Sequence, residues 1–473
     1  MDNIQKGYDN KGYETDIKNK DSNWHTVNLD SRNEKRQIAS EGDDYDPYQH
    51  RDIKHPIRAS EALIHLLKGS LGTGILAMPA AFKNSGYIVG IICTFIVGLI
   101  CTYCVHVLLS TNYEQSKRKR VPHLTYPELA ETALAGGPNF FKVFTPIIGH
   151  VTKIFLIIVQ LGTSCVYVVF ISDNIKNIVD YYTEKEDHID IRLYMCMILL
   201  PLILINWVRN LKYLAPFTAI GNVATIVSFG VILYYIFREP ISVVGRDAAA
   251  PIEKFPLYLG TVLFALEAIG VVIPLQNEMK SPKNFGRPIG VLNIAMFVIV
   301  SLYMGMGFCG YLKYGADIKG SITLNLAKDE VLAQSVKGML AFSIYITHAL
   351  QSYVAIDILW NHYIKKRLSS RFTFWEYVVR TCSTLVTFIF AIAIPNLELF
   401  ISLVGALCLG VLGLALPATI QMSTYWFQTS GFARVRLIAL NSFIFLVGII
   451  GFIIGTTISI IEIIDSFSKP KTE

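Results

Sequence analysis

The sequence predicts an all-helical protein that crosses a membrane many times. Of its 473 residues, 52% are hydrophobic and only 16% are charged, whereas ordinary soluble domains have roughly 25% charged residues. A bilayer core of about 30 Å needs roughly 20 apolar residues per helix, and residues 60–465 contain such runs repeatedly. This composition argues against a soluble enzyme.

Eleven apolar runs follow one another, and we predict a transmembrane helix in each. They cover residues 61–83, 86–110, 143–171, 192–208, 213–237, 256–278, 288–312, 333–360, 373–394, 397–421 and 433–464. Residues 1–59 contain few aliphatic side chains and cannot bury enough apolar surface to offset the entropy of ordering. We therefore predict a disordered tail at 1–59, a membrane domain at 60–465 and a short tail at 466–473.

Lys and Arg are distributed unevenly among the loops between these runs. Alternate loops, beginning after the second run, hold fifteen of them, against ten in the opposite set, which is spread over longer loops. The positive-inside rule then places the N-terminus in the cytosol and the C-terminus outside or in a lumen. The excess positive charge lies in short loops, so it indicates topology and contact with membrane lipids, and we predict no nucleic-acid partner.

The first and sixth runs share a pattern that predicts broken helices. A glycine-rich stretch at 69–74 precedes Pro79, and Gly270 precedes Pro274. Glycine frees the backbone and proline removes a hydrogen-bond donor, so both helices are expected to unwind near the middle of the membrane. An ordinary kinked helix explains either pattern alone, but the matched pair favours two related halves.

Helices one and six correspond if the domain consists of two inverted repeats of five helices. Secondary transporters commonly have this organisation, with broken helices at the substrate site. The repeats then cover about 60–237 and 256–421, and 433–464 is an extra helix.

Unwound backbone inside a membrane must line a polar cavity, and the N–H groups at the start of a half-helix favour a carboxylate. We predict that a small α-amino acid binds with its carboxylate at the first break and its ammonium at carbonyls freed in the sixth helix. The surrounding aliphatic side chains favour an uncharged substrate side chain, because a second charge would be desolvated without a partner. The predicted substrate-binding residues are Gly69, Ser70, Leu71, Gly72, Thr73, Gly74, Ala268, Ile269 and Gly270.

Ionisable side chains inside a membrane are costly and usually functional. Glu61, His65 and Gly72 fall on one face of the first helix, and an imidazole that titrates near pH ~6.5 can take up a proton from an acidic compartment. We predict proton coupling through His65 and Glu267; a hydrogen-bonded packing histidine and a structural carboxylate are the alternatives. The proton is the coupling ion, and no cofactor is expected.

Four stretches resemble the proton-coupled amino acid transporter family of the amino acid/auxin permease superfamily, and its insect members in particular. They are ALIHLLKGSLGTGILAMPAAFKNSG (62–86), VQLGTSCVYVVFISDNIK (159–176), EAIGVVIPLQNEMK (267–280) and GSITLNL (320–326). The resemblance implies a LeuT-like five-plus-five fold and symport of small neutral amino acids such as alanine and glycine with protons. It also implies that His65 and Glu267 couple protons and that Gly72 to Gly74 form the break. Gln276 stands where the family has an acid.

Other functions and locations remain open. A receptor-like transporter that senses amino acids and signals to growth-control partners would share the same binding residues. Sodium-driven symport is an alternative mechanism, because Thr347, Gln351 and Ser352 offer oxygen ligands in the eighth helix. The sequence contains none of the HExxH or GxSxG motifs of membrane-embedded enzymes. Both the plasma membrane and the lysosome or late endosome fit the chain.

Overall fold

The computed structural model of the chain describes residues 45–51, 53, 56–183, 189–266 and 269–468. From Asp46 onward these residues form one compact unit. Apart from one parallel bridge between Ile57 and Met279, the described residues form helices, turns and irregular segments. The chain is therefore all-helical, as the sequence predicts.

The α-helices follow the order of the predicted apolar runs. They are α2 Ala59–Ser70, α3 Thr73–Ser85, α4 Tyr87–Lys119, α5 Tyr126–Ala135, α6 Asn139–Lys142, α7 Thr145–Thr183, α8 Ile191–Asn206, α9 Ala215–Phe237, α10 Phe255–Ala265, α11 Ile269–Glu278, α12 Val291–Tyr314, α13 Val331–Ile358, α14 Phe372–Ala393, α15 Leu397–Val404, α16 Leu416–Tyr425 and α17 Gly431–Ser468. The π-helical segments η7 Leu359–Ile364 and η9 Gly405–Ala415 continue α13 and join α15 to α16. Short 3-10 turns are η1 Pro47–Gln49, η2 Leu211–Tyr213, η3 Ile252–Lys254, η4 Pro282–Asn284, η5 Gly315–Asp317, η6 Ile322–Asn325 and η8 Lys365–Arg367.

Eight helices among the described residues are long and apolar enough to cross a membrane, or nine if the bent pair α2 and α3 is one span. Helix α8 is apolar but has only 16 residues, and α10 and α11 share the sixth predicted run. Each of the eleven predicted runs coincides with helical segments. The chain is a multi-pass membrane protein, and the number of its crossings stays a prediction.

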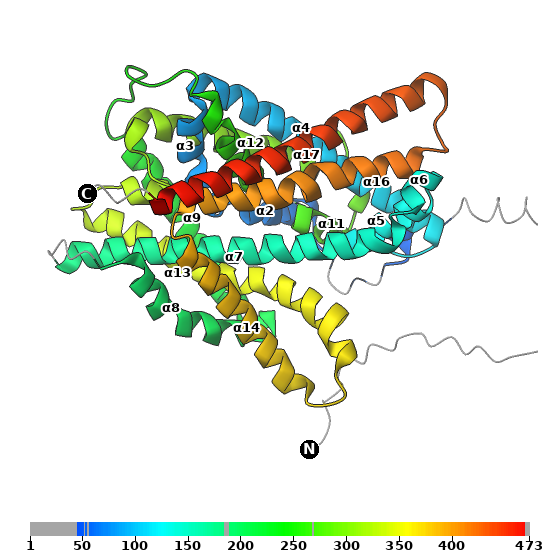
Figure 1. The fold of residues 1–473 in the computed structure, drawn as a ribbon, viewed down its shortest axis with the longest axis horizontal. Helices are drawn as coiled ribbons and strands as arrows, with labels where there is room; N and C mark the ends of the chain where they lie inside the picture. The colour runs from blue at the N-terminus through cyan, green and yellow to red at the C-terminus, as the bar shows by residue number, and fades with distance from the viewer. Residues whose placement is uncertain (1–44, 52, 54–55, 184–188, 267–268, 469–473) are drawn as a thin grey trace, which may run out of the picture. The chain divides into compact units, whose positions relative to one another are not determined.

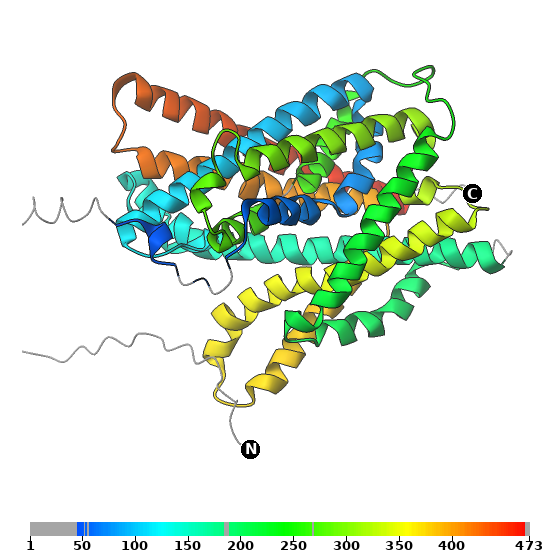
Figure 2. The ribbon, with the colours of Figure 1, turned by 180° about the vertical axis from the view of Figure 1, so that it is seen from behind.

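Helix α7 extends along the bundle between two groups of helices. In Figure 1, α8, α13 and α14 lie on one side of α7, and α16 and α17 lie on the other. Helix α7 packs against α13, and α13 packs in turn against α9, which crosses it in the view from behind (Figure 2). Helix α3 packs against both α10 and α12, so the first and sixth predicted helices meet in the interior.

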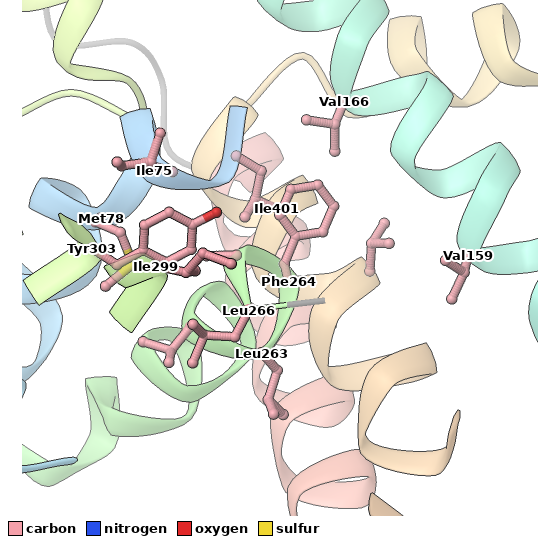
Figure 3. Packing of buried hydrophobic residues seen from close by; sticks show 14 of the residues in the cluster. Ile75, Met78, Val159, Val166, Leu263, Phe264, Leu266, Ile299, Tyr303 and Ile401 are labelled. Carbon is pink, nitrogen blue, oxygen red and sulfur yellow. The ribbon is translucent and has the colours of Figure 1, made fainter. Parts of the chain in front are cut away.

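The main apolar core runs through most of the bundle and includes the place where α3, α10 and α12 meet. Figure 3 shows Ile75 and Met78 of α3 close to Tyr303 of α12, with Phe264 of α10 and Leu266, which follows α10, beside them. All five side chains are buried. This packing fixes the start of α3 against α10.

Large apolar side chains also cover the outside of the bundle. Ile226 on α9 is 67% exposed, Phe297 on α12 is 72% exposed and Phe443 on α17 is 59% exposed. Soluble proteins rarely expose apolar patches on this scale, whereas the surface of a membrane domain faces hydrocarbon. The outer surface is therefore suited to lipid.

A buried ion-pair network joins α14 to the end of α8. Arg380, which is 4% exposed, donates to Oε1 of Glu376 through Nε at 3.1 Å and Nη2 at 3.0 Å. Its Nη1 donates to the carbonyl of Asn206 at 2.9 Å. Asn206 ends α8, so Arg380 satisfies a carbonyl that has no partner within its own helix. Arg209 lies 2.8 Å from the other carboxylate oxygen of Glu376.

We predict that Glu376→Ala strongly destabilises the protein, because it leaves the buried Arg380 without its carboxylate. Breaking a buried pair in this way costs about 3–5 kcal/mol. The matched control is Glu114→Ala, which removes the ion pair with Arg118, 2.9 Å long and more exposed. This variant should lower the free energy of unfolding by about 1 kcal/mol or less. Melting temperatures in detergent compare the two variants, and equal shifts would contradict a stabilising role for the buried pair.

Candidate functional site

The first predicted helix is divided into α2 and α3, which meet at an angle of 52°. Only Leu71 and Gly72 separate them, and Gly72 has the extended angles φ −136° and ψ −149°. Pro79 lies within α3 and does not interrupt it. The change in direction occurs at Leu71 and Gly72, within the glycine-rich stretch at 69–74 where the break is predicted, and glycine adopts a non-helical conformation there.

Ser70 ends α2, and both of its oxygen atoms have partners. Its hydroxyl donates to the carbonyl of Leu66 at 3.1 Å, and its carbonyl accepts a hydrogen bond from the hydroxyl of Tyr303 on α12. Tyr303 is fully buried. It therefore satisfies one of the carbonyl groups that the end of α2 leaves without a helical partner.

A cavity of about 1300 Å³ begins at this break. Helix α7 contributes one side chain to its wall at each turn, from Lys153 through Leu156, Gln160 and Thr163 to Tyr167. At 1.5 Å per residue this stripe is about 21 Å long. Tyr167 lies near Tyr303, whose hydroxyl donates to the carbonyl of Ser70, so the Tyr167 end of the stripe lies near the break.

The two ends of the cavity differ in charge. The break end has uncharged lining residues, which are Gly69, Ser70, Gly72, Thr73, Gly74, Gln160, Thr163, Tyr167, Phe264, Ala265 and Gln351. The other end has titratable lining residues, which are His50, Arg51, His123, Glu128, Lys153, Glu278, Asp357 and His362. A ligand at the break would therefore meet hydroxyl, amide and aromatic groups and free backbone.

Glu128 on α5 is ionised at the charged end. Burial alone would raise the pKa of Glu128, but the backbone N–H of Thr125 at 2.9 Å and the Thr125 hydroxyl at 2.8 Å hold that pKa below its ordinary value. Its carboxylate therefore contributes a fixed negative charge beside the basic residues of the cavity.

The glycines of the break are not equivalent. A Cβ atom at Gly69 or Gly72 would meet nothing within 4 Å. A Cβ atom at Gly74 would lie 2.7 Å from the Cα of Ala265. Helix α10 therefore occupies the space beside the Cα of Gly74; Gly74 still lies in the cavity wall, and its contact with a substrate stays a prediction.

Of the two predicted proton-coupling residues, the structure describes only His65, which lies outside the cavity wall. Glu61 accepts a hydrogen bond from the backbone N–H of Arg58 at 2.9 Å and so caps the start of α2. His65 is exposed on α2 and is not among the lining residues. Glu267 lies outside the described residues, so the pairing of His65 with Glu267 stays a prediction.

The predicted ammonium site in the sixth helix is described only in part. Ala268 lies outside the described residues, and of Ile269 and Gly270 the structure describes the backbone alone, at the start of α11. Helix α10 ends at Ala265. Contacts of this segment with a substrate stay a prediction.

Gln160 and Thr163 on α7 belong to the site, although the sequence analysis did not select them. Both side chains are buried, and Oε1 of Gln160 and Oγ1 of Thr163 have no hydrogen-bond partner among the described residues. Their signal in the sequence is two polar residues one helical turn apart within an apolar helix of 39 residues.

The last part of the predicted disordered tail is ordered, which corrects its boundary at residue 59. Ile57 pairs with the backbone at the end of α11. Its N–H donates to the carbonyl of Glu278 at 2.9 Å, and its carbonyl accepts from the backbone N–H of Lys280 at 2.8 Å. The amide of Gln276 donates to the hydroxyl of Tyr48 at 3.1 Å, and Arg51 donates to the carbonyl of Asn277 at 2.6 Å. The amide of Gln276 thus holds the segment that precedes α2.

An ion pair and an aromatic contact complete this attachment. Asp46 lies 2.8 Å from Lys283, and the ring of Tyr48 lies 4.8 Å from that of Tyr113. Burial alone would raise the pKa of Asp46, but the hydrogen bond and charge of Lys283 outweigh this effect and hold the pKa below its ordinary value. Burial also raises the pKa of Tyr48 to about 12, so Tyr48 stays a neutral hydroxyl.

Polar contacts hold the far end of α3. Asn84 donates to Oε1 of Glu398 on α15 at 2.6 Å, and Nζ of Lys83 donates to the carbonyl of Ile318 at 3.4 Å. None of these residues lines the cavity. These contacts attach the far end of α3 to α15 and to Ile318, away from the residues that line the cavity.

Comparisons with known proteins agree on the kind of protein. A family profile of transmembrane amino acid transporter proteins matches residues 55–461. The chain is 38% identical over 442 residues to the proton-coupled amino acid transporter-like protein pathetic of Drosophila melanogaster, with 93% of each chain covered. It is 25% identical over 452 residues to the probable amino acid transporter skat-1 of Caenorhabditis elegans, with 92% of this chain and 98% of the relative covered.

The crystal structure of MhsT in complex with L-phenylalanine is similar at a TM-score of 0.47 and 12% identity, and the match covers 85% of this chain and 100% of that one. The family profile and the two relatives confirm the resemblance seen in the sequence, and nearly the whole membrane region takes part in it. The chain belongs to the family of transmembrane amino acid transporter proteins, and it is a multi-pass transporter of amino acids rather than an enzyme.

Proposed function

We propose that the protein is a secondary active transporter that carries small neutral amino acids together with protons. The observation that carries the proposal is the break at Leu71 and Gly72, which opens onto the uncharged end of a cavity. The proposal includes eleven transmembrane helices in a LeuT-like five-plus-five inverted repeat, with α2 and α3 as the first broken helix and α10 and α11 as the sixth.

The start of α3 suits the carboxylate of an amino acid. The first N–H groups of a helix have no partners within it, and its dipole favours a negative charge there. Thr73 begins α3, and both Thr73 and Gly74 line the cavity. The open space at Gly72 allows the carboxylate to approach these N–H groups.

The uncharged surroundings of the break favour a neutral side chain on the substrate. The charged lining of α7 begins at Lys153, ten residues before Thr163 and thus about 15 Å along the helix. The side chain of a bound arginine or glutamate would therefore be desolvated without an opposite charge beside it, at a cost of several kcal/mol. Glycine and alanine carry no such charge.

The state of the cavity supports an inward-facing transporter. The segments that line its charged end are those that the positive-inside rule assigns to the cytosol, while the Asn84–Glu398 contact lies at the opposite end of α3. In this orientation the N-terminus is cytosolic and the substrate leaves through the charged end. The same arrangement serves the plasma membrane or a lysosomal or late endosomal membrane.

Protons are the proposed coupling ion, with His65 and Glu267 as the residues that carry them. The printed name of the Drosophila relative includes proton coupling. Sodium has less support from α13. Of the three candidate sodium ligands only Gln351 lines the cavity.

Uptake of labelled alanine should be faster at about pH 5.5 than at about pH 7.5 and should not change when sodium is replaced by choline. His65 is the proposed proton carrier, so His65→Ala should remove the stimulation by acid. Vesicles without the protein are the control, and alanine should compete with labelled glycine while arginine and glutamate compete weakly.

Loss of uptake in choline would overturn proton coupling in favour of sodium. Alanine binding without uptake at either pH would instead favour the sensing receptor. Strong, saturable arginine or glutamate uptake would contradict the neutral site.

The two glycines of the break should respond differently to the same substitution. Gly72→Leu should fold and reach the membrane in normal amounts but lower uptake at least about tenfold, because its side chain fills the space for the ligand. Gly74→Leu should destabilise the protein by about 1–3 kcal/mol, because it overpacks α3 against Ala265. Surface labelling, melting temperature and uptake separate the two effects, and wild-type uptake by a normally expressed Gly72→Leu would place the substrate elsewhere.

A further inference from the structure

The hydroxyl of Thr163 differs from the other serine and threonine hydroxyls in the interior of α7; Thr145, the first residue of the helix, also has a buried hydroxyl without a partner in the part of the chain that the structure describes. Thr152 donates to the carbonyl of Ile148 at 2.8 Å, Ser164 to that of Gln160 at 2.9 Å and Ser172 to that of Val168 at 2.9 Å. Such a bond to the preceding turn is the common arrangement for a hydroxyl within a helix. Thr163 is 4% exposed, yet its hydroxyl has no partner among the described residues.

Gln160 lies one turn before Thr163 and has the same feature. It is 5% exposed, and its Oε1 has no partner in the described part of the chain. A buried polar atom without a partner destabilises the folded state, so such atoms mark places where a ligand or water completes the hydrogen bonding. An amide oxygen accepts hydrogen bonds only, so the missing partner of Gln160 is a donor.

The position of the two side chains indicates which hydrogen-bond donor would complete their bonding. Among the described residues that line the cavity, Gln160 and Thr163 alone have a buried side-chain oxygen without a partner. Both belong to the uncharged end of the cavity, whose wall also includes Gly72 and Thr73, and α3 contacts α7. No carboxylate lines this end among the described residues, so a cation bound here depends on neutral oxygen atoms.

We propose that Gln160 and Thr163 bind the ammonium group of the transported amino acid through Oε1 and Oγ1. The inference rests on the proposed function, in which the carboxylate lies at the start of α3. An ammonium group has three N–H donors, so two can reach α7 while the third remains for carbonyls of the sixth helix. Helix α7 thus recognises the amino group, a part that all α-amino acids share.

The test compares glycine with glycine betaine, whose trimethylated nitrogen carries the same charge but no N–H donor. Each compound is titrated as an inhibitor of labelled alanine uptake by the full-length protein. The variants are Thr163→Val and Gln160→Met, which keep the size of the side chain and remove the acceptor. Thr152→Val is the matched control, since it makes the same change on the same helix at a hydroxyl that already has a partner and does not line the cavity.

Both variants should raise the half-inhibitory concentration of glycine about tenfold, the loss expected for one hydrogen bond to a charged group. The half-inhibitory concentration of betaine should change less than about twofold. If betaine does not inhibit the wild-type protein at all, this result also shows that binding needs N–H donors. Thr163→Ser should restore glycine inhibition, and Thr152→Val should leave it unchanged.

Unchanged glycine inhibition in both variants, with active wild-type protein, would overturn the ammonium site and leave the proposed function intact. An equal loss for glycine and betaine would also overturn it, since a general disturbance of the cavity does not distinguish N–H donors. Wild-type protein that neither binds nor transports any amino acid would instead refute the proposed function, and the inference with it.

Discussion

Two residues of non-helical backbone inside an apolar bundle impose the constraint on which the rest of the structure depends. Leu71 and Gly72 interrupt the first helix, and hydrocarbon offers no partner for the backbone groups that the interruption frees. The chain meets this requirement in two ways. The hydroxyl of Tyr303 donates a hydrogen bond to the carbonyl of Ser70. The other backbone groups at the break border a cavity that water or a ligand can fill.

The helices around the break divide into a wall and two attachments. Helix α7 provides a continuous wall along the cavity from Lys153 to Tyr167. At one end the segment before α2 is joined to α11 through Ile57 and Met279, and at the other end Asn84 joins α3 to α15. The two halves of the broken helix thus have separate polar attachments, and both also pack against α12.

The helices could be predicted from the sequence because a long apolar run in a chain with few charges has one common structural solution. The details of the site could not, because they depend on neighbours distant in the sequence. Gly72 and Gly74 look alike in the chain, and only the approach of Ala265 distinguishes them. Helical spacing places His65 on the same helix face as Gly72, but in the folded chain the cavity wall includes Gly72 and not His65. Thr163 resembles Thr152 until their hydrogen bonds are compared.

The central claim is that the break faces a cavity that holds the substrate and opens on the side of residues 122–128. A single cysteine tests this claim most directly. The eight native cysteines are replaced, and Gly69→Cys is introduced, because a Cβ atom at Gly69 meets nothing within 4 Å. A membrane-impermeant maleimide should label this cysteine from the side of residues 122–128, and alanine but not arginine should slow the labelling. Labelling only from the opposite side, or at a rate that alanine does not change, would contradict the claim.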